Sequence, residues 1–148
     1  MAFHFSLAAV LRYRQGLEER ERIRLQNLHT RRAALLREAQ QLRETRACLQ
    51  GSLRQRLEKR LTAAVEVQFL IASCDGLHRR EQQLQVSLFQ VQAEIAAQAQ
   101  RYREQRQGRE VLESLRQARW SEYQLVQRRR EQAIVDELLL LRRNRKPA

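Results

Sequence analysis

The sequence predicts an all-α protein in which two long helices form an antiparallel coiled-coil hairpin. Leu, Arg, Gln, Glu and Ala supply most of its 148 residues, a composition typical of long helices. The only proline is Pro147, so no proline interrupts a helix within the first 146 residues. Apolar residues also recur with a seven-residue repeat. We therefore expect a single coiled-coil domain over residues 1–148, because this length supplies one domain at most.

The first arm shows the repeat at Leu28, Leu35, Leu42 and Leu49, which are seven residues apart. The second arm continues it with steps of four and three. Those residues are Leu84, Leu88, Val91, Ile95 and Tyr102. Such spacing predicts a left-handed coiled coil with one apolar seam. Polar residues interrupt this seam at several positions: Arg32, Arg46, Gln98, Gln105, Arg109 and Arg116.

The reversal of the chain is expected near its midpoint, at Ser73-Cys74-Asp75-Gly76. Asp-Gly is typical of turns. Placing the turn at about 74–76 gives a first arm over about 6–73 and a second over about 77–145. Residue i then lies opposite roughly residue 150 − i, as antiparallel pairing requires. Gly51-Ser52 is a rival turn, ranked lower because its arms would be very unequal.

Two segments carry more apolar residues than a seam needs. The segment from Ala63 to Ile71 is apolar nearly all round, and it either closes the hairpin tip or forms a docking patch. The run Leu138–Leu141 covers every face of a helix. Packing against Phe3, Phe5 and Leu11 is expected to cover part of this run, and a partner the remainder.

The sequence contains no recognisable set of catalytic, cofactor-binding or metal-ligating residues. The sequence contains no glycine-rich phosphate loop, no His-Glu-x-x-His and no Gly-x-Ser-x-Gly. Cys48 and Cys74, if on one helix, lie roughly 39 Å apart, too far for a disulfide. No run of 18 apolar residues and no signal peptide is present. We therefore expect a cytoplasmic protein that is not an enzyme and uses no cofactor.

The excess of arginine is the strongest chemical feature, with a formal net charge of +12. Glu–Arg pairs on a solvated helix surface account for many arginines, but not for the surplus. An acidic protein ring or channel would attract it, and so would a nucleic-acid backbone. Nucleic acid is disfavoured because aromatic residues are only 5% of the chain. An anionic membrane surface is a third, less specific partner.

Both ends of the chain carry a distinctive motif. Residues 3–14 (FHFSLAAVLRYR) have the pattern Phe-x-Phe-x-Leu-x-x-Val-Leu followed by basic residues, and this pattern resembles the opening of the flagellar FliJ protein family. Arg128-Arg129-Arg130-Glu131-Gln132, followed by Asp136-Glu137, resembles its closing segment. This resemblance implies an antiparallel coiled coil of the flagellar type III export apparatus, similar to the central stalk of rotary ATPases.

The resemblance also implies partners: the hexameric export ATPase, the membrane export gate protein and export chaperones, at the inner face of the cell membrane. The implied contacts with the ATPase ring fall on Phe3, Phe5, Leu7, Val10, Leu11, Arg128, Arg129, Arg130, Glu131, Asp136 and Glu137. A contact with the export gate is assigned only by nearness to the turn. The residues concerned are Val67, Phe69, Leu70 and Ile71.

Three alternatives stay open at this point. The first is the equivalent stalk of a virulence type III secretion system, which gene neighbourhood would separate from the flagellar version better than sequence does. A basic coiled coil that binds nucleic acid would show steeply salt-dependent binding. An extended chain could instead pair with a second copy of itself, which would make it about twice as long as a hairpin.

Overall fold

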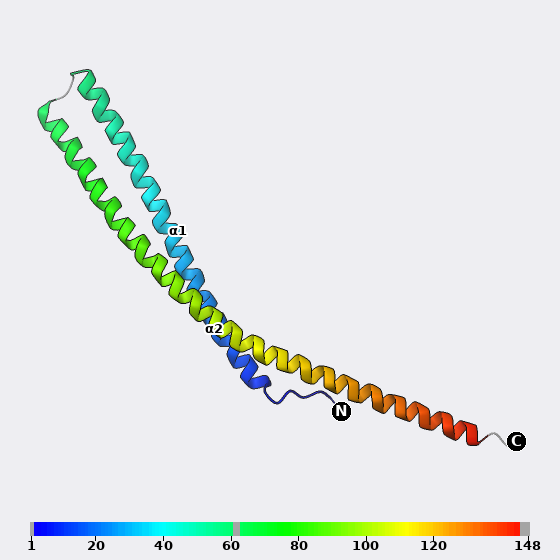
Figure 1. Ribbon diagram of the computed structural model, residues 1–148. Coiled ribbons are helices and arrows are strands. Elements are labelled where there is room, and N and C mark those ends of the chain that lie inside the picture. The colour runs from blue at the N-terminus through cyan, green and yellow to red at the C-terminus, as the bar shows by residue number, and fades with distance from the viewer. Residues whose placement is uncertain (1, 61–62, 146–148) are drawn as a thin grey trace. The chain divides into compact units, whose positions relative to one another are not determined.

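The computed structural model of the protein describes residues 2–60 and 63–145. Two α-helices, α1 (Ala8–Glu58) and α2 (Ala64–Asn144), contain most of these residues, and no strand occurs among them. The helices pack against each other as an antiparallel pair (Figure 1). This confirms the predicted all-α fold class and the two-helix hairpin.

Helix α1 begins where the amino-terminal sequence predicts. The Ala8 amide donates to the Phe5 carbonyl at 3.1 Å, and the Leu11 amide donates to the Leu7 carbonyl at 2.9 Å. Ala8 is the first helical residue, two later than the start of the first arm expected at about residue 6. Phe3 and Phe5 precede the helix.

The predicted turn position is wrong. Residues 74–76 lie inside α2, and Gly51-Ser52, the rival position, lies inside α1. The Ser73 hydroxyl donates to the Phe69 carbonyl at 2.9 Å, so it serves the helix interior and does not cap a helix start. A glycine in a helix costs only about 1 kcal/mol. Burial of a single leucine such as Leu84, which is 2% exposed on the same helix, contributes about 1.5–3 kcal/mol and exceeds this cost.

The chain leaves α1 at Lys59 and Arg60. Arg60 has a φ of 51°, the left-handed conformation with which many helices end. The Arg60 amide donates to the Leu57 carbonyl at 3.3 Å, and the Glu66 amide opens α2 by donating to the Ala63 carbonyl at 3.0 Å. Glu66 lies in the first turn of α2, where the helix dipole favours a carboxylate. Leu61, a predicted seam residue, lies outside the described residues.

The pairing register follows the observed turn. Ion pairs join Arg56 to Glu66, Arg46 to Glu81, Arg80 to Glu38 and Arg31 to Glu94. The residue numbers in each pair add up to between 118 and 127, and the predicted total of about 150 is wrong. Because this total is smaller than predicted, the first residue of α1 lies opposite the interior of α2. The carboxyl-terminal part of α2 therefore extends past the first residue of α1.

The chain divides into two compact units. The hairpin unit consists of Arg20–Tyr102, and the terminal unit combines Met1–Glu19 with Arg103–Ala148. That the whole chain forms one domain stays a prediction. Cys48 lies on α1 and Cys74 on α2, and both are free thiols. The distance of roughly 39 Å expected for two cysteines on one helix therefore does not apply to this pair.

The hairpin unit has a narrow core with one polar layer. Leu84, Val91 and Ile95 on α2 are buried, and so is Ala39 on α1. The Gln98 side chain is also buried, at 6% exposure. Its amide donates to the Glu21 carbonyl at 3.1 Å and to the Glu21 carboxylate. These bonds satisfy a polar group that would otherwise be costly to bury.

Candidate docking surfaces

The terminal unit is held together by an aromatic cluster that joins the amino-terminal segment to α2. The Phe3 ring meets Trp120 edge-on, with centroids 5.0 Å apart, and lies 5.6 Å from Tyr123. Trp120 and Tyr123 stack at 5.7 Å. Such pairs contribute about 0.5–1.5 kcal/mol each beyond their burial. This cluster fixes the segment before α1 on the face of α2.

The predicted amino-terminal contact residues have different environments. Phe5 and Leu11 are buried, at 8% and 3% exposure, so they contribute to packing inside the terminal unit. Leu7 is half-buried, and Val10 is 43% exposed. Of these four, Val10 is therefore the residue best able to touch another protein.

Arg109 organises the polar layer of the terminal unit. Its guanidinium donates to the Glu18 carboxylate across the seam and to Glu113 one turn further along α2. The hydrogen bond to Glu18 raises the pKa of Arg109 above its ordinary value, and the charge of Glu113 adds to this. Because the pKa is raised, the stabilising contribution is present at neutral pH and on the basic side is lost only above the ordinary arginine value. The pair therefore introduces no switch near neutral pH.

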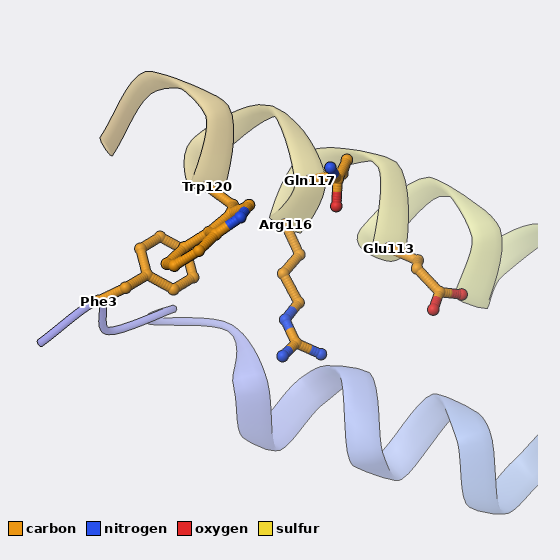
Figure 2. A pocket seen from close by; sticks show the side chains of 5 residues that line it. All are labelled: Phe3, Glu113, Arg116, Gln117 and Trp120. Atoms are coloured by element: carbon orange, nitrogen blue, oxygen red, sulfur yellow. The ribbon is translucent and has the colours of Figure 1, made fainter. Parts of the chain in front are cut away.

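An open hollow lies beside the aromatic cluster (Figure 2). Phe3, Trp120, Glu113, Arg116 and Gln117 line it. Figure 2 shows the Arg116 side chain extending from α2 toward the start of α1, with the Phe3 and Trp120 rings on one side of it. A second hollow shares Phe3 and Arg116 and adds Arg12. Apolar and cationic groups thus meet in one place.

The carboxyl-terminal part of α2 carries the predicted closing motif on an exposed helix. All six motif residues are exposed: Arg128, Arg129, Arg130, Glu131, Asp136 and Glu137. This part of α2 runs on beyond the amino-terminal segment (Figure 1). Charged side chains of both signs are therefore available to a partner.

The expectation that Phe3, Phe5 and Leu11 cover the run Leu138–Leu141 is wrong. Each of these leucines is between 56% and 59% exposed. The Phe3 ring instead contacts Trp120 and Tyr123, because the register brings the start of the chain to residues about 18 positions earlier on α2 than Leu138. Ile134 and Val135 are also about half exposed. Apolar side chains here are available for docking.

A second exposed apolar patch lies at the start of α2 in the hairpin unit. Phe69 is 71% exposed and Ile71 is 47% exposed, while Val67 and Leu70 are half-buried. Val65, which belongs to the predicted apolar segment from Ala63 to Ile71, is 75% exposed. These residues follow directly on the observed turn, although the turn lies about 13 residues earlier than predicted. The patch therefore lies near the hairpin turn, as predicted, although the turn itself is elsewhere in the sequence.

Sequence reasoning missed Trp120, Tyr123 and Arg12 as parts of a surface. Once the numbers of paired residues are known to add up to about 123, Phe3 falls opposite residue 120, so the position of the turn is enough to place Phe3 beside Trp120.

Metal-ligating groups of three or more His, Cys, Asp or Glu do not occur within residues 2–60 and 63–145. Neither helix, over the same residues, contains a stretch apolar enough to cross a bilayer.

A hairpin of two long helices places the protein in the class of all-α coiled-coil proteins. The chain belongs to the flagellar FliJ protein family, whose match covers residues 3–148. This family is a structural component of the flagellar export apparatus. The comparison with curated proteins found no match, and neither did the comparison with solved structures. The resemblance at the two ends of the sequence is thereby confirmed.

Proposed function

We propose that the protein is a stalk-like coiled coil that links the hexameric export ATPase ring to the membrane export gate. It carries out no chemical step of its own, and it works beside the export chaperones at the inner face of the cell membrane. Family membership over residues 3–148 supports the export role. The observation that carries the stalk role is the exposed part of α2 that runs past the start of α1.

The proposed contact with the ATPase ring uses this carboxyl-terminal part of α2. Arg128, Arg129 and Arg130 are exposed, and a ring lumen lined with carboxylates would attract them. Glu131, Asp136 and Glu137 follow the three arginines along the helix and add carboxylates to the contact. Val10 adds an apolar contact from α1. Phe5 and Leu11, whose side chains are buried, contribute packing within the terminal unit and not direct contact.

The proposed contact with the export gate uses the patch at the start of α2. Phe69 and Ile71 offer exposed apolar area, and Val67 and Leu70 extend the patch toward α1. Apolar side chains that remain exposed on a helix are typical of docking surfaces. Contacts in two different units of the chain allow a single molecule to touch two partners.

The coupling we propose follows from symmetry. A hexameric ring presents six equivalent subunits, whereas a two-helix hairpin presents different side chains in each direction. The subunits therefore contact the hairpin differently, and their nucleotide affinities differ accordingly. Binding of the hairpin then coordinates ATP turnover among the sites.

The test measures ATP hydrolysis by the cognate hexamer with and without the full chain. We expect the wild-type chain to raise the rate, and R128A/R129A/R130A to lose most of this increase. The matched control is R32A/R54A/R79A, which removes the same charge from exposed arginines of the hairpin unit and should keep the increase. An unchanged rate with the wild-type chain would contradict the stalk role. Equal losses in both variants would reduce the contact to non-specific charge.

A further inference from the structure

Arg12 and Arg116 approach one hollow of the terminal unit from the two helices. Arg12 lies on α1 and Arg116 on α2, and both line the opening that also contains Phe5 and Leu11. Across residues 2–60 and 63–145, no carboxylate forms an ion pair with either guanidinium. Two cations that share one opening repel each other, and an anion placed between them would relieve this repulsion.

Two other arginines in the seam differ from Arg116 in this respect. Arg46 donates to Glu81 at 2.9 Å, and Arg109 is paired with Glu18 and Glu113. Glu113 lines the hollow with Arg116, but its carboxylate is held by Arg109. The fold thus supplies carboxylates to these seam arginines and leaves the Arg116 guanidinium to an outside acceptor.

The aromatic side chains beside Arg116 suit an apolar side chain better than a nucleotide base. Trp120 uses one face against Tyr123, since the two rings are inclined by only 22°. Phe3 meets Trp120 edge-on at 73°. A base would need a free ring face on which to stack, whereas an aliphatic or phenyl group can pack on the ring edges that line the hollow.

We infer that these two hollows, which share Phe3 and Arg116, dock one acidic segment of a partner protein; Arg12 lines one hollow and Trp120 the other. A carboxylate of the segment lies between the Arg12 and Arg116 guanidiniums, which can bind it with paired hydrogen bonds. A neighbouring apolar residue of the segment packs on Phe3 and Trp120. The site adds an amino-terminal contact to the surface of Arg128–Arg130, and it holds whether or not the partner is the ATPase ring.

The experiment uses the only tryptophan of the chain, Trp120, as a reporter inside the hollow. The full chain is titrated with a capped peptide, Glu-Asp-Leu-Phe-Glu-Asp, while tryptophan emission is followed. We expect a saturable change in emission. R12Q and R116Q should each weaken the affinity about tenfold, as expected for the loss of a charge-assisted hydrogen bond. R79Q, which removes an exposed arginine of the hairpin unit, should change the affinity less than twofold.

Two further peptides separate charge from apolar contact. Gln-Asn-Leu-Phe-Gln-Asn lacks the carboxylates and Glu-Asp-Ser-Ser-Glu-Asp lacks the apolar pair, and both should bind at least tenfold more weakly. Circular dichroism of each variant checks that the helices are intact. Equal binding of the neutral peptide, an equal effect of R79Q, or the absence of saturation would overturn the inference.

Displacement of the peptide by oligo(dT) at a lower concentration than the peptide's own would also overturn the inference, and would assign the hollow to nucleic acid. The peptide titration contains no ATPase. Its failure therefore leaves the stalk proposal intact, and a failed ATPase assay leaves this site intact.

Discussion

Leu84 and Phe89 lie five residues apart on α2, yet their burial differs greatly. Leu84 is 2% exposed and Phe89 is 78% exposed. L84A should lower the free energy of unfolding by about 2–4 kcal/mol, because it leaves a cavity in a narrow core. F89A serves as the control and should change it by less than about 0.5 kcal/mol. Urea unfolding followed by circular dichroism measures both, and similar losses would contradict the observed core.

The spacing of the sequence predicts which polar residues lie in the seam, but not which acceptors they bind. Gln98 and Arg109 stand at seam positions by sequence spacing alone, and both lie on the inner side of α2. Their acceptors, Glu21 and Glu18, became visible only with the register. Charged acceptors are too numerous in this sequence for spacing to choose among them.

At the scale of the helix, the glycine at position 76 tests where the chain turns. Gly76 lies within α2, and a Cβ added to it meets no atom within 4 Å. G76A should therefore raise the free energy of unfolding by about 0.5–1 kcal/mol, since alanine is the better helix former. G51A in α1 has the same open surroundings and sets the size of the effect. Destabilisation by G76A alone would restore the turn at 74–76.

The seven-residue repeat explains why the turn was misplaced. The predicted and observed registers differ by about 27 residues in the pair total, which is close to four whole repeats. A shift by whole repeats brings apolar residues opposite apolar residues again, so seam matching accepts both registers. Specific contacts such as Arg46 with Glu81, and Phe3 with Trp120, separate them.

On the scale of the whole molecule, helical order is expected to be stable only where α1 and α2 pack together. Leu84, Val91 and Ile95 are buried in the hairpin unit, whereas Ile134 and Leu138–Leu141 are each more than half exposed in the terminal unit. In hydrogen exchange, amides of residues 84–98 should be protected at least a hundredfold more than amides of residues 130–141.

Exchange in the presence of the cognate ATPase hexamer extends this test. Protection of residues 130–141 should rise on binding, while protection of residues 84–98 stays the same. Equal protection of the two segments in the free chain would mean that something already covers the end of α2.

Composition, the absence of proline before residue 147 and the seven-residue repeat determined the all-α class and the two long helices. The sequence over residues 3–148 determined the family. These features are local, or repeat along the chain, so they can be read without knowing which residues meet. The turn at Lys59–Arg60, the length of α2 left beyond α1 and the hollow between Arg12 and Arg116 were decided by the tertiary structure. Each depends on one register among several that the same repeat allows, and only contacts between distant residues select it.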